Sequence, residues 1–152
     1  MQILNLKNEP HHISTLAEWH HNEWSYLNPA GSIEKRIEKM QSYLGADLIP
    51  STFIAKETEL LGSAAIVDSD MDTRPELFPW LASVFVAPAY RNQGIGSSLV
   101  KHVSQKAQEA GIEALYLFTP DRENFYQKLG WQVLSKQDYR GHPVTVMCIK
   151  LS

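Results

Sequence analysis

The most informative stretch of the sequence is Val84-Phe85-Val86-Ala87-Pro88-Ala89-Tyr90-Arg91-Asn92-Gln93-Gly94-Ile95-Gly96-Ser97-Ser98-Leu99. An apolar run ends at Pro88, a short polar loop follows, and two glycines begin an amphipathic segment. This pattern predicts a strand followed by a helix whose first turn has little side-chain bulk. The first N–H groups of a helix have no partner within it, and the helix dipole adds positive charge there. We therefore expect a phosphate or pyrophosphate group to bind at this helix start, where glycine allows close approach.

Three kinds of glycine-rich phosphate loop could account for this pattern. A Walker A loop requires a Gly-Lys pair, and the chain contains none. A dinucleotide-binding turn requires a third glycine, where this chain has Leu99. The third kind is the Arg/Gln-x-x-Gly-x-Gly/Ala loop that binds the pyrophosphate of coenzyme A, and residues Arg91 to Gly96 fit it throughout.

Two neighbouring motifs strengthen this interpretation. The loop is preceded by an apolar-x-Val-x-Pro-x-Tyr-Arg sequence, and it is followed later by Phe125-Tyr126-Gln127-Lys128-Leu129-Gly130-Trp131. With these motifs in this order, the chain resembles the GCN5-related N-acetyltransferase (GNAT) superfamily. The resemblance implies an α/β sandwich: a mixed, mostly antiparallel sheet with a splayed central parallel strand pair and helices on both faces.

Length and composition set the broad class of the protein. The chain has 152 residues and is 43% hydrophobic, so we expect one globular domain over residues 1–152. A net charge of −3 argues against a nucleic-acid-binding protein, and no apolar stretch approaches the length of a membrane span. The single cysteine, Cys148, cannot form an internal disulfide, and it is expected to be a packed thiol. These features favour a cytoplasmic protein without a membrane partner.

Hydrophobic periodicity and turn residues predict the order β-α-α-β-β-β-α-β-α-β-β. Pro10 suits the first turn of a helix, and Ser32 is a candidate N-cap of the next. The expected strands cover residues 2–7, 52–56, 60–67, 80–86, 113–119, 131–137 and 143–151. The expected helices cover residues 10–27, 32–44, 94–110 and 121–128.

The resemblance implies transfer of an acetyl group from acetyl-CoA to a primary amine by direct attack on the thioester. Tyr126 would be the catalytic acid that donates a proton to the departing thiolate. Backbone groups of Val84 and Val86 would pair with the pantetheine arm, and an N–H in that strand would stabilise the thioester oxygen. The loop residues that would bind the cofactor are Arg91, Asn92, Gln93, Gly94, Ile95, Gly96 and Ser97.

The residue that accepts the proton of the amine is not evident from the sequence. Relatives carry a glutamate in one of two strands, where this chain has Leu81-Ala82-Ser83 and Leu117-Phe118-Thr119. Asp121, Glu123 and His142 are expected to be solvated or capping residues, and water would relay the proton. Asn124 does not inherit the asparagine role of relatives, because the loop before Tyr126 is shortened.

The acceptor is predicted only as a small-molecule or peptide amine. Trp24 and the nearby helices are expected to border its pocket. The acidic residues of one loop could attract a cationic amine, although an ordinary solvated loop is the favoured interpretation: Asp68, Asp70, Asp72 and Glu76. No metal is expected, because adjacent histidines of the pairs at 11–12 and 20–21 should point in different directions from a helix and no His-Glu-x-x-His spacing occurs.

Two alternative functions stay open at the level of the sequence. The missing carboxylates would suit a catalytically weak CoA-binding sensor or a partner-binding domain, whereas the presence of Tyr126 argues against one. A different nucleotide-binding protein is the other alternative. Dimerisation is neither indicated nor excluded by the residues.

Overall fold

The computed structural model describes residues 1–152 and contains one seven-stranded sheet with the strand order β1-β2-β3-β4-β5-β7-β6. Every neighbouring pair is antiparallel except β4 and β5. This is the mixed sheet with a central parallel pair that the sequence predicts. The strands are β1 (Gln2–Asn5), β2 (Ser51–Lys56), β3 (Leu60–Val67), β4 (Trp80–Val86), β5 (Ala114–Thr119), β6 (Gln132–Tyr139) and β7 (His142–Lys150).

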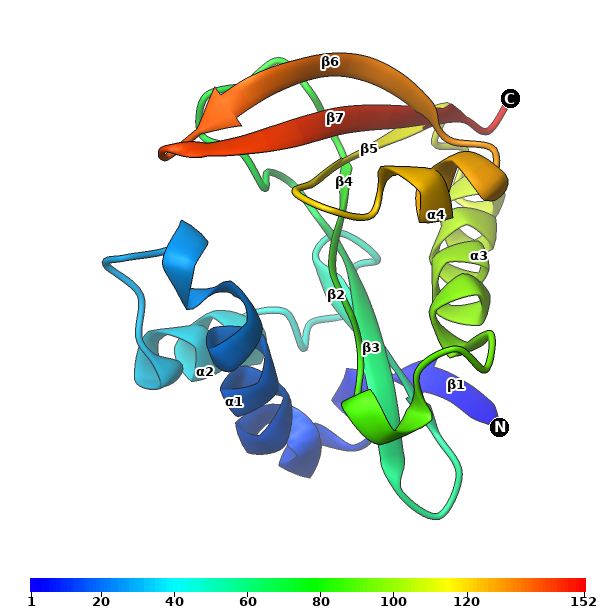
Figure 1. Cartoon of the computed structure of the whole chain (residues 1–152). Coiled ribbons are helices and arrows are strands. Elements are labelled where there is room, and N and C mark those ends of the chain that lie inside the picture. Colours follow the sequence, from blue (N-terminus) through cyan, green and yellow to red (C-terminus); the bar gives the residue numbers. More distant parts are fainter.

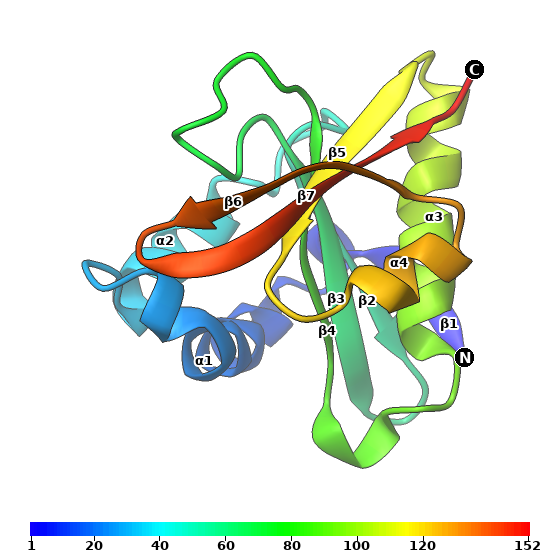
Figure 2. The same ribbon diagram turned by 45° about the horizontal axis from the view of Figure 1, so that its top comes forward.

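Helices cover both faces of this sheet (Figure 1). The pair α1 (Ile13–Trp24) and α2 (Ile33–Gln41) packs on one face, and α3 (Ile95–Glu109) with the short α4 (Glu123–Lys128) packs on the other. A second view shows the same separation of the α1–α2 pair from α3 (Figure 2). No helix has the length and the apolar character that crossing a membrane requires.

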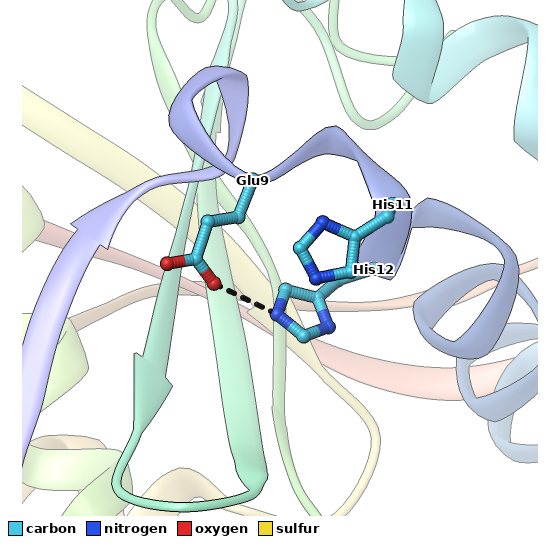
Figure 3. A group of neighbouring side chains, drawn as sticks. All are labelled: Glu9, His11 and His12. Atoms are coloured by element: carbon cyan, nitrogen blue, oxygen red, sulfur yellow. Dashed lines mark hydrogen bonds and ion pairs between the residues drawn. The ribbon is translucent and has the colours of Figure 1, made fainter.

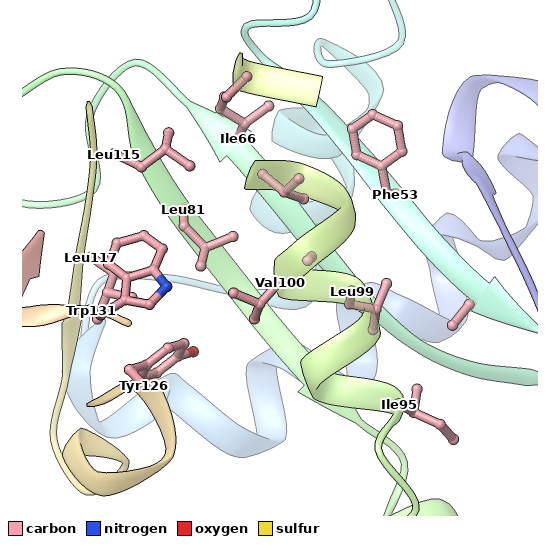
Figure 4. Close-up of a cluster of buried hydrophobic side chains, with 14 of the residues drawn as sticks. Phe53, Ile66, Leu81, Ile95, Leu99, Val100, Leu115, Leu117, Tyr126 and Trp131 are labelled. Carbon is pink, nitrogen blue, oxygen red and sulfur yellow. The ribbon is translucent and has the colours of Figure 1, made fainter. Parts of the chain in front are cut away.

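The largest core cluster lies between α3, α4 and the sheet (Figure 4). Leu99 and Val103 of α3 are fully buried there, against Leu81 of β4 and Leu115 of β5. The alternation of side chains along β2 places Phe53 in this cluster and its neighbour Ile54 under α1 and α2. The sheet is thus covered on both faces, which is why its central strands are almost entirely apolar.

The element order predicted from the sequence is confirmed, and the boundaries differ where local turns intervene. The helix expected over residues 10–27 is α1, flanked by the 3₁₀ turns Pro10–His12 and Ser25–Leu27. The side chain of Ser32 accepts a hydrogen bond from the backbone N–H of Lys35 at 3.1 Å, as the predicted cap requires. The first strand ends at Asn5 because the Asn5 side chain caps a 3₁₀ turn.

The parallel pair β4–β5 is held together over a very short length. Trp80 and Tyr116 form its one pair in register, and the Tyr116 N–H donates to the Pro79 carbonyl at 3.1 Å. Beyond this point the two strands have no ladder between them, and a cavity lies along both. The expected splaying of the central strands is therefore present.

Gly62 of β3 allows the close approach of β3 and β4. An added Cβ at Gly62 would collide with the Phe85 carbonyl oxygen and lie 3.2 Å from Val86 Cα, and both are backbone atoms that cannot rotate away. We therefore expect Gly62→Ala to destabilise the fold by about 1–3 kcal/mol. For a domain of this size each kcal/mol lowers Tm by about 2–4 °C in a thermal melt.

Gly45→Ala is the matched control for this experiment. A Cβ at Gly45 would have no heavy atom within 4 Å, so its Tm should stay close to that of the wild type. Equal melting temperatures for the two variants would contradict the tight β3–β4 contact.

Candidate active site

A cavity of about 640 Å³ occupies the gap between β4 and β5. Its wall is formed by the end of α1, the length of β4, the loop before α3, the first turn of α3, the end of β5 and α4. Trp24 contributes to the α1 side, as expected. Nine of the ten predicted site residues lie in this wall. Gln93 is the exception, since its side chain is exposed outside the cavity.

The loop before α3 contains two residues in the left-handed backbone conformation and lines the cavity. Asn92 and Gly94 adopt left-handed conformations with φ of 65° and 81°, and the helix begins at Ile95. A Cβ at Gly94 would meet nothing within 4 Å, so the space in front of the helix start is open. A Cβ at Gly96 would lie 3.4 Å from Phe125 Cζ, so the glycine lets α4 pack beside the first turn. This open helix start fits a phosphate group.

Arg91 connects this loop to the rest of the cavity wall. Its Nε donates a hydrogen bond to the Val86 carbonyl at 2.9 Å, and its Nη2 lies 3.6 Å from Glu23 Oε2. The guanidinium also lies over the ring of Phe85, 5.4 Å from its centroid. Arg91 thus fastens the loop to β4 and to α1. The Val86 carbonyl, one of the groups expected to pair with the cofactor, already accepts this bond.

Tyr126 projects from α4 toward α3 beside Trp131 (Figure 4). The residue is only 8% exposed, and it lines the cavity. Burial raises the pKa of its phenol, and the nearby carboxylates of Asp121 and Asp70 raise this pKa further, while Arg122 opposes them. The phenol therefore stays protonated over the whole physiological range and is available as a hydrogen-bond donor.

A buried polar chain supports an irregularity in β4. Ser83 has a φ of 53°, and the register of β3 against β4 shifts between Ser63 and Ala65. Ser63 Oγ donates to the Ser83 carbonyl at 3.0 Å, and His20 Nε2 lies 2.8 Å from the same Oγ. Because the Ser63 hydroxyl has one proton, His20 must donate through Nε2. Burial lowers the pKa of His20 well below its usual value, which keeps the ring neutral.

Asp70 is the one of the four acidic loop residues that the structure places in the main cavity. It is half-buried and lines the main cavity, whereas Asp68 is exposed and Asp72 and Glu76 are exposed partners of arginines. The interpretation as a solvated loop therefore fits those three residues and fails for Asp70. Asp70, at the start of the loop after β3, shares a cavity with Arg36 and Lys39 of α2, and a charge pattern in the sequence does not reveal this placement.

Burial raises the pKa of Asp70 to about 6. Three cations oppose this shift: Lys39 and Arg36 of α2 and Arg140 of the β6–β7 turn. A carboxyl group with this pKa is charged at neutral pH and takes up a proton readily, as a general base requires.

The other polar residues near the site have structural partners. Glu123 accepts a hydrogen bond from Thr145 Oγ1 at 3.0 Å and lies 3.4 Å from Lys136 Nζ. Asp121 is exposed beside Arg122, and the ring of His142 packs on Tyr26. Asn124 does not line the cavity.

His11 and His12 do not diverge as expected. Both lie in the 3₁₀ turn before α1 rather than in the helix, and their rings are 4.2 Å apart beside Glu9 (Figure 3). The potential ligand atoms of these three residues lie within 4.8 Å of one another. The Glu9 carboxylate accepts hydrogen bonds from Lys56 Nζ at 2.8 and 2.9 Å, so its negative charge is already paired with the Lys56 ammonium group.

Comparison with known proteins identifies the family. Residues 50–133, more than half of the chain, match the model of the acetyltransferase (GNAT) domain. The chain belongs to the GNAT acetyltransferase family. The matched segment of this GNAT domain runs from the start of β2 to the start of β6 and includes the loop, α3 and Tyr126.

Relatives of this GNAT domain include the amino-acid acetyltransferase of Mannheimia succiniciproducens, which is 24% identical over 102 residues. That match covers 67% of this chain and 22% of the relative, so the chain spans about a fifth of the length of that protein. The N-acetyltransferase YitI of Bacillus subtilis is 38% identical over 48 residues, which is 31% of this chain and 32% of YitI.

Solved structures share the fold along the whole chain. An aminoglycoside 6′-N-acetyltransferase complexed with coenzyme A superposes with a TM-score of 0.79 at 16% identity, covering 100% of this chain and 98% of the other. The Salmonella typhimurium protein YncA with acetyl-CoA gives a TM-score of 0.71 at 17% identity, covering 100% and 94%. Acetyl-CoA, which the sequence predicts, is the cosubstrate of this family.

The open space at Gly94 leads to a test of the cofactor loop. Gly94→Glu would put a carboxylate where a phosphate is expected, so we expect acetyl-CoA affinity to fall at least tenfold in calorimetry, roughly 1.4 kcal/mol. Gly111→Glu is the matched control, because Gly111 lies at the other end of α3 with φ of 83° and equally open surroundings.

Both variants carry the same left-handed strain, so their melting temperatures should fall by similar amounts. The Gly111 variant should bind acetyl-CoA like the wild type. Unchanged affinity in a folded Gly94→Glu protein would remove the loop from the cofactor site.

Proposed function

We propose that this protein transfers the acetyl group of acetyl-CoA to a primary amine by direct attack of the amine nitrogen on the thioester carbon. The main support is that one cavity joins the open start of α3, the separated edges of β4 and β5, and the buried phenol of Tyr126. The acceptors named for relatives and structural neighbours are amino acids and aminoglycosides, and both classes carry amines.

In this proposal the backbone N–H groups of the loop and of the first turn of α3 bind the pyrophosphate. The pantetheine arm lies along β4, where Val84 and Val86 line the cavity. Most of the rate enhancement comes from alignment, because a thioester is already an activated acyl donor. Arg91 keeps the loop and β4 in fixed relation through its bond to the Val86 carbonyl.

Protons move at two places in the reaction. The attacking nitrogen forms the C–N bond and loses a proton to the carboxylate of Asp70. The C–S bond breaks, and the leaving sulfur receives a proton from the Tyr126 hydroxyl, which is then reprotonated from solvent. Asp70 supplies the carboxylate whose absence from β4 and β5 suggested a catalytically weak sensor, so catalysis is the favoured alternative.

Removal of the Tyr126 hydroxyl tests its role as acid. Tyr126→Phe keeps the ring that packs on Trp131 and deletes only the donor. We expect kcat to fall at least about tenfold, because general-acid help is typically worth 10²–10⁴ in rate. The Kd for acetyl-CoA should change little. Amine-dependent thiol release and calorimetry measure the two quantities.

Tyr116→Phe is the control, since Tyr116 packs on a different core cluster outside the cavity. It should retain the wild-type kcat. Wild-type turnover in the Tyr126 variant would assign acid catalysis to water.

The pH dependence of kcat/KM tests Asp70. An alkyl amine with a pKa near 10 must lose a proton to attack, so log kcat/KM should rise with pH with a slope of about 1 between about pH 6.5 and 9. Asp70 acts as the charged form, and its pKa is about 6, so the slope should steepen toward 2 as pH falls below that value.

Asp70→Asn should lose the additional limb and keep a slope of about 1 throughout, at a lower overall rate. A wild-type profile without the steeper limb would show that Asp70 does not take up the proton. A flat profile between pH 6 and 9 would indicate an acceptor of low pKa.

A further inference from the structure

The main cavity contains as many acidic as basic residues. Its charged residues are Glu23, Arg36, Asp70, Arg91, Asp121 and Arg122. Four of them form two ion pairs, Arg91 with Glu23 at 3.6 Å and Arg122 with Asp121 at 3.9 Å. One guanidinium and one carboxylate, those of Arg36 and Asp70, have no ion pair within 4.0 Å and no side-chain hydrogen bond.

Arg36 is unusual because its charge is partly removed from water and has no ion-pair partner within 4.0 Å. The side chain is half-buried, and burial lowers the pKa of its guanidinium. It comes from α2, on the face of the sheet opposite α3 (Figure 1). The pyrophosphate expected at the start of α3 therefore lies on the other side of the sheet from Arg36. A guanidinium offers five N–H donors in a planar fork that matches a carboxylate.

Asp70 and Arg36 face a common space. Both line the main cavity and a second one of about 240 Å³ beside it, and the Arg36 charge acts on the Asp70 carboxyl. They still do not approach within ion-pair distance. Within the second cavity, Arg140 is engaged by the Leu27 carbonyl, Asn28 and Asp72, which leaves Arg36 as the half-buried cation that is available to a ligand.

We infer that the acceptor is a zwitterion: its amine lies at Asp70 and its carboxylate is bound by Arg36. This inference rests on the proposed transfer to an amine and adds the class of acceptor. A ligand with one amine and one carboxylate would engage both groups at once, because the amine can donate a hydrogen bond to Asp70 and the carboxylate can pair with Arg36. A polycation would meet a cavity wall with three arginines and three acidic residues. Asp70 is the only one of these acidic residues without an ion-pair partner. The geometry therefore favours amino acids over polyamines.

The inference is tested with pairs of acceptors that differ only in the carboxylate. Common α-amino acids are compared with their carboxamides in the thiol-release assay, each at equal concentrations of unprotonated amine. For an amino acid that is acetylated, kcat/KM should exceed that of its carboxamide at least tenfold. Arg36→Gln should abolish this preference by lowering kcat/KM for the acid at least tenfold and for the carboxamide much less. Loss of the Arg36 charge raises the pKa of Asp70, so both acceptors are compared at about pH 8.5, where Asp70 stays charged.

Lys39→Gln is the matched control. Lys39 lies one turn further along α2, is exposed, and borders the second cavity but not the main one. Its variant should keep the preference for the acid. Calorimetry should give the same acetyl-CoA affinity for the wild type, Arg36→Gln and Lys39→Gln, because both substitutions lie in the acceptor half of the site.

The outcomes separate the inference from the proposed function. If carboxamides or simple alkyl amines react as well as the acids, the transferase proposal stands and the zwitterionic acceptor is wrong. If no amine of any kind stimulates thiol release, the transferase proposal fails and the inference fails with it. If Arg36→Gln does not fold, the ratio of acid to carboxamide in the wild type decides the question alone.

Discussion

The site depends on the incomplete pairing of β4 with β5. Every other pair of neighbouring strands in the sheet is joined by an antiparallel ladder of several residues. The parallel strands β4 and β5 share only one pair in register, Trp80 with Tyr116. A strand edge without a ladder leaves backbone N–H and C=O groups that need partners. In this protein those edges border the main cavity. The separation therefore creates both the space and the polar backbone that an amide-containing ligand can use.

Residues around β4 hold the strand and the loop that follows it in position. Gly62 lets β3 approach β4 closely, and the chain from His20 through Ser63 to the Ser83 carbonyl holds the irregular part of β4. Arg91 fastens the following loop to the same strand. The α1–α2 pair contributes to one wall and α3 with α4 to the other, so cofactor and acceptor can approach the cavity from different faces of the sheet.

Much of the fold could be predicted because its determinants are local. The apolar run of β4, the glycines at the start of α3 and the Ser32 cap each act within a few residues. The sequence motifs predict a cofactor loop and an acid at Tyr126, and nine of the ten predicted site residues line the cavity.

The sequence does not distinguish Asp70 from the other acidic residues of its loop, and it does not indicate Arg36. Asp70 and Arg36 line the same cavities because the start of the loop after β3 lies near α2, and no sequence motif connects residues that far apart in the chain. The expectation for His11 and His12 was wrong because it assumed an α-helix where the chain forms a 3₁₀ turn. The Arg91–Val86 bond also joins a side chain to a backbone group, which residue patterns do not reveal.

A crystal structure of the protein with acetyl-CoA would test the central claim most directly. We expect the pyrophosphate oxygens on the backbone N–H groups of the α3 start and the pantetheine arm between β4 and β5. We also expect the thioester sulfur within hydrogen-bond distance of the Tyr126 hydroxyl, about 3–3.5 Å. A cofactor bound outside the β4–β5 gap, or a sulfur remote from Tyr126, would contradict it.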